Sequence, residues 1–459
     1  MLSVIDIQVS RGAPMIAFAG MTPEQRARVK IDQQLSDAGW AVHDRQEINL
    51  YAAQGVAVRE TTMATGAGRA DYLLYVDQVI VGVIEAKPAG TTLSEVHWQS
   101  RRYAFGLTND QQLNALMVGG EVPFIFEASG VETYFTNLYD PEPRARRVFN
   151  VPRAEAIARI IREVASDNGR TWRGKVHDLP TLESYDLRPA QFRSIKALER
   201  SLREQQFDRS LVQMATGAGK TRMAVTECYR LLKFGGFNRI LFLVDRNNLG
   251  DQTVREFADY TTPDDGRKFT QLYAVDKLSS AGLVDSSKVV VSTIQRVWSV
   301  LKGEAIPDVD DPHQDSFQPT APVEVTQYNP EMPPEAFDLI IVDECHRSIY
   351  GLWRGVLDYF DAHVVGLTAT PTKQALGYFH QNLVAEYTFA ESVADNVNVD
   401  FDVFRIQTSI TAHGSVIEAG SVVPAFDRRT RVQRAQMLED DVPYAANELD
   451  RSVVVLHVS

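Results

Sequence analysis

The stretch SLVQMATGAGKTRMAVTECYRLL, residues 210–232, contains a short apolar strand, a glycine-rich loop and a helical stretch in that order. A phosphate-binding loop needs this order, because the backbone N–H groups of the loop and the start of the helix then face an anion together. We expect Lys220 to reach the β- and γ-phosphates and Thr221 to hold Mg²⁺. The expected nucleotide-binding residues are Thr216, Gly217, Ala218, Gly219, Lys220 and Thr221. The alternative is a glycine turn before an ordinary helix.

Short apolar strands alternate with helical stretches from Leu187 onward. The strands are SLVQM (210–214), RILFLVD (239–245), KVVVST (288–293), DLIIVD (338–343) and HVVGLTAT (363–370). This alternation predicts a parallel sheet with helices on both faces. Residues 303–337 interrupt it with a proline- and acid-rich stretch that lacks periodicity. We expect this stretch to be an exposed insertion.

Two further motifs accompany the loop. DLIIVDECH (338–346) places Asp343 and Glu344 at the carboxyl edge of a buried strand. Asp343 would hold the metal through water, and Glu344 would orient or activate the attacking water. LRPAQFRSI (187–195) lies a short way upstream of the loop, where Gln191 is placed to read adenine.

The motif GLTATP (366–371) ends the next strand, so several independent motifs follow one another in a fixed order. The order resembles the first motor domain of superfamily 2 helicases and translocases, with DECH as the DEAD/DEAH box and TAT as the coupling motif. The resemblance covers roughly residues 187–372 and implies ATP and Mg²⁺ as cofactors. It also implies that Thr370, on the nucleotide side, and Thr368, on the DNA side, couple the state of ATP to the grip on DNA.

Two intervening strands end in residues that this resemblance assigns to DNA. They lie in LVDRNNLGDQ (243–252) and VSTIQRV (291–297). By the resemblance, Arg246 and Thr293 are contacts to the DNA strand. The alternative for Arg246, and for Arg296, is a solvated surface charge.

The stretch ADYLLYVDQVIVGVIEAKP, residues 70–88, predicts two apolar strands joined by a short turn, with charges at one end. We expect a three-residue turn, residues 77–79, which sets Asp71 directly opposite Glu85. A two-residue turn would shift the pairing by one. Facing carboxylates repel each other, so this register predicts Mg²⁺ between them. Lys87 would then position or activate a water, or stabilise charge on a phosphate. The alternative is a solvated hairpin rim in which Lys87 pairs with a carboxylate.

An Asp followed by Glu-x-Lys on neighbouring strands resembles the core of PD-(D/E)XK nucleases. Gln99 and Tyr103, four apart and so on one helical face, match the Q-x3-Y element of the RecB-like branch. The resemblance therefore adds Gln99 and Tyr103 to the candidate catalytic residues. That branch also expects an acid on the first helix, which the capped amphipathic stretch 21–40 predicts. Glu24 and Asp32 both qualify.

The fold class that follows is α/β: a PD-(D/E)XK nuclease domain with a mixed sheet flanked by helices, then a RecA-like parallel-sheet motor domain. The expected boundaries are an N-terminal extension (1–20), the nuclease domain (21–166), the motor domain (167–400) and a charged connector (401–459). Motors of this family have two RecA-like domains. Because 401–459 carry no second motif set, we expect a truncated or interrupted chain that binds ATP without translocating.

A RecB-like nuclease followed by a superfamily 2 motor resembles the restriction (R, HsdR) subunit of type I restriction–modification enzymes. The resemblance implies ATP-driven translocation on double-stranded DNA, metal-dependent cleavage, and assembly with methyltransferase (M) and specificity (S) subunits. Target recognition would belong to a partner, which agrees with the net charge of −13. The alternatives are a stand-alone helicase–nuclease of another defence or repair system and a non-catalytic assembly module.

Composition narrows the setting of the protein. The only cysteines, Cys228 and Cys345, argue for a reducing cytoplasm and against a disulfide framework. No apolar run approaches the roughly 18 residues needed to span a bilayer. The start of the chain lacks the pattern of a signal peptide. We therefore expect a cytoplasmic protein without a membrane partner.

Overall fold

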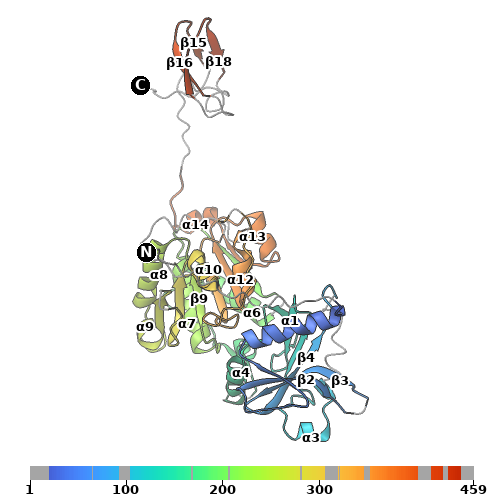
Figure 1. The fold of residues 1–459 in the computed structure, drawn as a ribbon. Helices are drawn as coiled ribbons and strands as arrows, with labels where there is room; N and C mark the ends of the chain where they lie inside the picture. Colours follow the sequence, from blue (N-terminus) through green and yellow to red (C-terminus); the bar gives the residue numbers. More distant parts are fainter. Residues whose placement is uncertain are drawn as a thin grey trace, which may run out of the picture. The chain divides into compact units, whose positions relative to one another are not determined.

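The computed structural model describes residues 20–64, 66–91, 104–166, 169–204, 207–279, 282–304, 319, 321–345, 352–401, 415–426 and 433–445. The chain divides into two compact units, Met1–Asn398 and Val399–Ser459. The first unit contains two seven-stranded sheets, and the second contains two small two-stranded sheets (Figure 1).

The first sheet is mixed, and its strands lie in chain order. They are β1 (Ala41–Asp44), β2 (Gly55–Thr62), β3 (Arg69–Val76), β4 (Val79–Ala86), β5 (Phe124–Ala128), β6 (Thr133–Asn137) and β7 (Arg146–Val148). β1 pairs with β2, and β4 with β5, in parallel, while the other pairs are antiparallel. The accompanying helices are α1 (Pro23–Asp37), α3 (Asn109–Gln112) and α4 (Ala154–Ser166).

Helix α1 begins and ends where the sequence predicts. The side chain of Thr22 caps its first turn in a capping box with Gln25, and Pro23 occupies the first helical position. Gly39, just past the end, has the left-handed φ of 80° that glycine adopts without strain. The helix then buries Ile31 and Leu35 against the sheet.

Both faces of the first sheet are covered. Successive residues of β3 point to opposite faces, so Tyr72 and Leu74 enter a core shared with α1 and α4. Leu73, between them, enters a second core with Met63 and Leu107. This explains why the hairpin stretch is almost continuously apolar.

The second sheet is entirely parallel, with the order β10-β11-β9-β12-β13-β8-β14. Its strands are β8 (Arg209–Met214), β9 (Ile240–Leu243), β10 (Ala274–Lys277), β11 (Ser287–Ser292), β12 (Leu339–Val342), β13 (His363–Thr368) and β14 (Leu383–Tyr387). The five strands expected from the sequence are confirmed. The two edge strands, β10 and β14, are only partly buried and gave no apolar run to detect.

Helices cover both faces of this sheet, which lies between two apolar cores. The helices are α6 (Pro189–Glu204), α7 (Lys220–Lys233), α8 (Asn247–Asp259), α9 (Phe269–Leu272), α10 (Ile294–Leu301), α12 (Arg354–Tyr359), α13 (Lys373–Tyr378) and α14 (Phe389–Ala394). Two short elements, α5 (Trp172–Lys175) and η2 (Val176–Asp178), connect the two sheets. The predicted α/β class, a mixed sheet followed by a parallel sheet, is thus confirmed.

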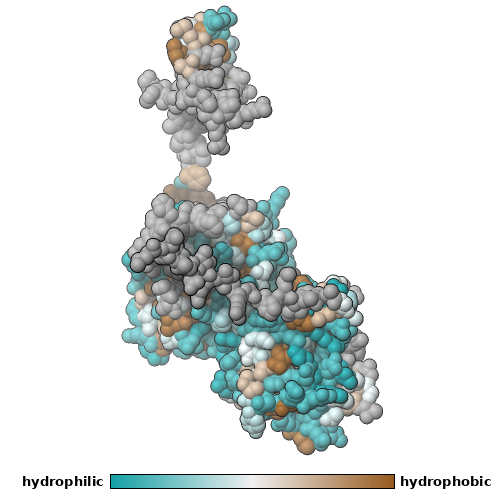
Figure 2. Space-filling model, viewed as in Figure 1, coloured by the Kyte–Doolittle hydropathy of each residue, from teal (hydrophilic) through white to brown (hydrophobic). Residues whose placement is uncertain are grey.

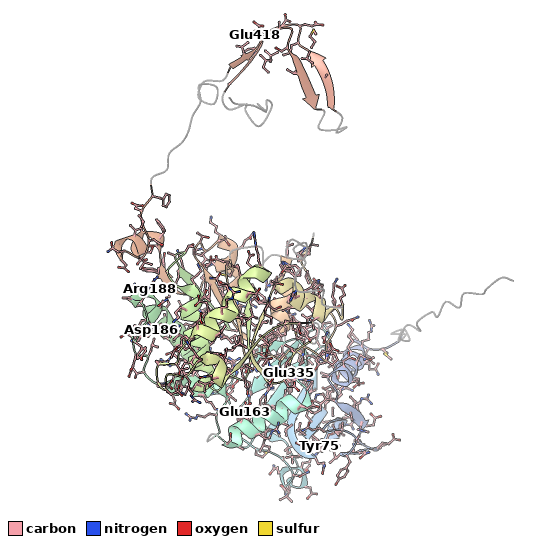
Figure 3. All side chains as sticks on the ribbon, turned by 90° about the vertical axis from the view of Figure 1, so that its left-hand side faces the viewer. Tyr75, Glu163, Asp186, Arg188, Glu335 and Glu418 are labelled. Carbon is pink, nitrogen blue, oxygen red and sulfur yellow. The ribbon has the colours of Figure 1, made fainter. Side chains whose placement is uncertain are left out.

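Ion pairs join the two halves of the first unit. Arg146 of β7 donates from Nε and Nη2 to the two carboxylate oxygens of Asp361, at 2.8 and 2.9 Å. Arg153 Nε lies 3.0 Å from Glu335 Oε1, and Figure 3 labels Glu335 and, on α4, Glu163. Further contacts join Phe149 with Tyr359 and Glu163 with Asn238. The half that contains the first sheet is therefore attached directly to the loop that leads into β13.

Two expectations about irregular segments need correction. In the segment 303–337, the described residues 321–337 are not an exposed insertion throughout. Met332 and Phe337 are buried in the core beneath α10 and α12, because apolar residues interrupt the prolines. The region 401–459 is not only a connector. It contains β15 (Ser415–Ile417) paired with β18 (Val442–Tyr444), and β16 (Val422–Phe426) paired with β17 (Gln433–Met437).

The face of the protein drawn in Figure 2 is mostly hydrophilic, with scattered apolar spots. Among the described residues, no helix combines the length and apolarity needed to cross a bilayer.

Candidate nuclease and nucleotide sites

The hairpin β3–β4 has the predicted pairing of Asp71 with Glu85, but its turn differs from the predicted one. Its turn has two residues, Asp77 and Gln78, both with positive φ, and Val76 pairs with Val79. Positive φ at both central residues suits the right-handed twist of the strands. The prediction of a three-residue turn is therefore wrong.

A bulge in β4 corrects the shift that this shorter turn would cause. Tyr75 pairs with Ile80 but Leu74 pairs with Gly82, so β4 carries one extra residue. The bulge restores the pairing of Tyr72 with Ile84, and one step further Asp71 faces Glu85.

Asp71 is held on both of its carboxylate oxygens. The backbone N–H of Ala86 donates to Oδ2 at 2.8 Å, and Arg28 Nη2 of α1 lies 2.5 Å from Oδ1. Arg28 also contacts Glu24 and Glu60, each at 2.9 Å. Asp71 is 8% exposed, so it is a nearly buried carboxylate with a fixed orientation.

Glu85 lies beside Asp71 and is also buried, at 6% exposure. Lys87 Nζ contacts Glu85 Oε1 at 2.7 Å, whereas Glu85 Oε2 has no hydrogen-bond partner among the described residues. Burial raises the pKa of Glu85 to about 7, the Asp71 carboxylate contributes to the rise, and Lys87 opposes it. Glu85 therefore binds a proton more readily than an exposed glutamate would.

These residues fit a divalent metal ion. Mg²⁺ takes oxygen ligands and commonly one or two carboxylates, and a buried carboxylate oxygen without a partner is a vacant donor. Among the described residues, no cluster of three or more His, Cys, Asp or Glu side chains forms a metal site. Mg²⁺ would thus be held by Asp71 and Glu85 with water or phosphate, as the sequence predicts.

Two other predicted nuclease residues, Gln99 and Tyr103, lie outside the described residues. The two first-helix acids occupy different surroundings. Asp32 accepts from Arg59 at 3.0 and 2.9 Å and from the hydroxyl of Tyr72 at 2.8 Å. Glu24 is half-exposed and reaches Asp71 only through Arg28. Both acids therefore stay candidates for the first-helix acid of the site.

The phosphate loop follows β8, and its lysine faces the acidic motif at the end of β12. Lys220 begins α7, is 8% exposed, and its Nζ lies 3.1 Å from Glu344 Oε1. Glu344 itself has the left-handed φ of 48°, which is uncommon for a residue with a side chain. Burial and then the charge of Glu344 raise the pKa of Asp343 to about 6. Carboxyl ends of parallel strands meet at one edge, which explains how residues more than a hundred apart come together.

The side chain of Gln191 is hydrogen-bonded to the phosphate loop. Its Nε2 donates to Gly219 O at 3.0 Å and to Ala218 O at 3.4 Å, and its Oε1 accepts from Arg188 N–H. Gly219 has the left-handed φ of 87° that favours glycine, and a Cβ there would lie 2.2 Å from Gln191 Nε2, so this amide would have to move. Adenine reading by Gln191 stays a prediction.

The predicted DNA contacts differ in their exposure. Arg246 is exposed at the start of α8, near Asp245. Thr293 and Thr368 are buried, at 1% and 0% exposure, and Thr368 Oγ1 accepts from Thr370 N–H. Their hydroxyls therefore do not face solvent in this structure, and a DNA contact by either residue stays a prediction. Arg296 is also buried, with Nη1 donating to Leu278 O, so it is not a solvated charge.

Sequence reasoning missed three side chains in or beside these sites. Arg28 lies one helical turn after Glu24, and a cation at that spacing from an acid was a signal in the sequence. Glu127 of β5, buried at 3%, is in register with Glu85 of the parallel neighbour β4. Asn398 donates to Thr216 O of the phosphate loop at 2.9 Å, and no motif indicated it.

Two protein families match the chain. The family described as "Type III restriction enzyme, res subunit" matches residues 184–373, which contain the phosphate loop and the DECH motif. The family described as "Type I restriction enzyme EcoKI endonuclease subunit second domain" matches residues 46–138, which contain the β3–β4 hairpin.

Curated relatives extend the similarity to most of the chain. The endonuclease subunit of the type I restriction enzyme EcoKI from Escherichia coli (strain K12) is 26% identical over 498 residues, 94% of this chain and 40% of the relative. The EcoAI endonuclease subunit from Escherichia coli is 26% identical over 399 residues, 82% of this chain and 43% of the relative. The chain thus spans less than half the length of these relatives.

A solved fragment assigned as an HsdR subunit of a type I restriction enzyme from Vibrio vulnificus YJ016 is 22% identical. The match covers 82% of this chain and 61% of the fragment, with a TM-score of 0.32. The sequence matches reach the hairpin and the motor motifs alike, as the order of the motifs predicted. The chain is therefore a homologue of the endonuclease (R) subunits of type I restriction enzymes.

Proposed function

We propose that the chain supplies the nuclease site and the first, ATP-binding domain of the motor of a type I restriction enzyme. It would act on double-stranded DNA together with methyltransferase and specificity subunits. The observation that supports this most is the presence, in one compact unit, of a buried carboxylate pair beside a lysine and of a phosphate loop facing Asp343 and Glu344.

In the proposed nuclease site, Asp71 and Glu85 would hold Mg²⁺, and Glu85 Oε2 offers a buried oxygen for it. Bound there, Mg²⁺ would act as a Lewis acid on the scissile phosphate and lower the pKa of a coordinated water. Lys87 would hold a water or stabilise negative charge on the phosphate, because its ammonium already lies 2.7 Å from Glu85. Arg28 and the Ala86 N–H would keep Asp71 oriented.

In the proposed motor site, Lys220 would exchange its ion pair with Glu344 for phosphate oxygens of ATP. Thr221 and Asp343 would hold the Mg²⁺ that accompanies the nucleotide. Glu344, released from Lys220, would orient or activate the attacking water. Thr370, hydrogen-bonded to Thr368, would relay the state of the nucleotide to the end of β13.

The partners follow from the same reasoning. A chain with a net charge of −13 has no general attraction for DNA, so selection of the DNA site would depend on the specificity subunit. The exposed Arg246 would contribute a local contact to the DNA backbone.

The proposal is tested by reconstitution with methyltransferase and specificity subunits on plasmids that carry or lack an unmethylated target site. Where a second RecA-like domain completes the motor, we expect cleavage only of the plasmid with the site, and only with both ATP and Mg²⁺. Lys220→Ala should abolish ATP binding and cleavage, while the assembly still forms. Cleavage by the chain alone, without ATP or partners, would overturn the assignment.

A further inference from the structure

Four consecutive carbonyl groups of the phosphate loop are each held by a side chain from outside the loop. Thr216 O accepts from Asn398 Nδ2 at 2.9 Å, and Gly217 O accepts from Arg188 Nη1 at 3.0 Å. Ala218 O and Gly219 O accept from Gln191. These donors come from two segments, the start of α6 and the chain just after α14.

This arrangement fixes the direction of the loop's N–H groups. In a trans peptide, the C=O of one residue and the N–H of the next point in opposite directions. Donors that hold the carbonyl groups of residues 216–219 therefore also fix the orientation of the N–H groups of residues 217–220, each of which points away from the donor on its own peptide. The Ala218 N–H closes a turn on Ala215 O. In a phosphate loop, the other N–H groups are the donors that bind phosphate oxygens.

Asn398 fits closely against the loop. Its Oδ1 lies 3.1 Å from the position that a Cβ on Gly217 would take, and Gly217 has a φ of 77°. The same amide donates to Ser392 Oγ at 2.9 Å, and the Asn398 N–H donates to Ser392 O. Ser392 is fully buried in α14. Ser392 of α14 therefore holds the Asn398 side chain in place while the same amide donates to Thr216 O.

Asn398 is also the last residue of the first compact unit, and Val399 begins the second. A change in the phosphate loop on nucleotide binding would therefore move Asn398, the residue at which the first unit ends.

Resting on the proposed ATP site, we propose that Arg188 and Asn398 are positioning residues for the nucleotide. They hold the phosphate loop in the shape that receives phosphate, and Asn398 passes the occupancy of the loop to the segment that follows it. Arg188, labelled in Figure 3 beside Asp186, is exposed and can be replaced without loss of core packing.

The test is the affinity of the full 459-residue chain for Mg²⁺–ADP and for a non-hydrolysable ATP analogue, measured by titration calorimetry. Loss of one hydrogen bond of about 1 kcal/mol corresponds to about a fivefold weaker affinity. We expect this loss for Asn398→Ala and for Arg188→Ala. Arg188→Lys should recover most of the affinity, because an ammonium group can still donate to Gly217 O. Asp400→Ala, two residues beyond Asn398, is the matched control and should bind like the unmodified chain.

Two further readouts separate positioning from a merely structural role. Denaturant midpoints without nucleotide should be unchanged in Arg188→Ala. Hydrogen exchange should show that the nucleotide protects both the phosphate loop and residues 397–401 in the unmodified chain, but only the loop in Asn398→Ala.

Unchanged affinity in both alanine variants, or equal protection of residues 397–401 in Asn398→Ala, would overturn this inference while leaving the ATP site intact. Failure of the unmodified chain to bind nucleotide would instead overturn the proposed function, and Lys220→Ala would then bind no differently.

Discussion

The backbone N–H of Ala86 donates to Asp71 Oδ2 at 2.8 Å, so the carboxylate of one strand is bonded to the strand that carries Glu85. This bond, between residues fifteen apart in the chain, closes the charged end of the hairpin. Arg28 reinforces it from α1. The two carboxylates consequently cannot separate without breaking buried hydrogen bonds.

Replacing Asp71 by asparagine tests whether this carboxylate holds a metal. The amide of the variant would keep an oxygen for the Ala86 N–H but lose the charge that attracts Mg²⁺. We expect Asp71→Asn to lower metal-dependent cleavage at least ~100-fold, equivalent to about 3 kcal/mol in the barrier. The measurement is nicking of supercoiled plasmid by the reconstituted complex.

The matched control for this change is Asp77→Asn, in the turn at the other end of the same hairpin. Asp77 accepts a 3.3 Å bond from the exposed side chain of Gln54, so the cleavage rate of this variant should stay unchanged. A similar loss in both variants would indicate damage to the hairpin rather than loss of a ligand.

The raised pKa of Glu85, about 7, predicts that metal binding depends on pH. Below pH 7 a proton competes with Mg²⁺ for this carboxyl, so the affinity should fall up to about tenfold per pH unit and level off above it. Calorimetric titration of Mg²⁺ or Mn²⁺ at pH 6, 7 and 8 measures this. Glu85→Gln, which cannot titrate, should bind weakly at every pH. A constant affinity in the unmodified chain would contradict the prediction.

The same pKa predicts the pH dependence of stability without metal. Because the folded state holds the proton on Glu85 more tightly than the unfolded state, the contribution of this group to the free energy of unfolding should decrease from about pH 4.5 to about pH 7. Above pH 7 the contribution is constant. Urea denaturation at a series of pH values measures this contribution. The free energy of unfolding should depend on pH differently in the unmodified chain and in Glu85→Gln only between about pH 4.5 and about pH 7.

The ion pair between Lys220 and Glu344, at 3.1 Å, predicts opposite effects of two substitutions. Lys220→Ala should abolish binding of ATP, because the phosphates lose their cation. Glu344→Gln should bind ATP as well as the unmodified chain or about two- to fivefold more tightly, since Lys220 is released from its partner. Hydrolysis by Glu344→Gln should nevertheless be lost. Weaker ATP binding by Glu344→Gln would contradict this competition.

The bidentate ion pair between Arg146 and Asp361 joins the two halves of the first unit, so we expect it to stabilise the folded chain. Both side chains are largely buried, so Arg146→Ala leaves Asp361 without its cation and should lower the free energy of unfolding by about 2–4 kcal/mol. Urea denaturation measures this. Arg144→Ala removes an exposed pair with Glu142 two residues away and should change nothing measurable. Equal effects would contradict a specific role for Arg146.

Much of the fold follows from local patterns in the sequence. The five central strands of the parallel sheet are apolar runs because helices cover both of their faces, and each precedes a motif at the same edge. The N-cap Thr22 and Pro23 mark the start of α1 for the same local reason. Edge strands such as β10 and β14 lack such a pattern because they are only half covered.

Other features depend on contacts between residues that are far apart in the sequence, and a local sequence pattern does not indicate such contacts. The bulge in β4 accompanies Gly82, where a Cβ would lie 2.3 Å from Phe124 O of the neighbouring strand. Thr293 and Thr368 are buried in the folded chain, which no local pattern around them indicates. Asn398 reaches Thr216 across 182 positions, so only the folded chain reveals the contact.

The central claim, that Asp71, Glu85 and Lys87 form a metal-dependent nuclease site, is tested most directly with Lys87→Ala. The complex reconstituted with this variant should hydrolyse ATP like the unmodified complex, because the motor site is untouched. Its Mg²⁺-dependent cleavage of double-stranded DNA should fall at least ~100-fold. Cleavage at the unmodified rate by Lys87→Ala would contradict the claim.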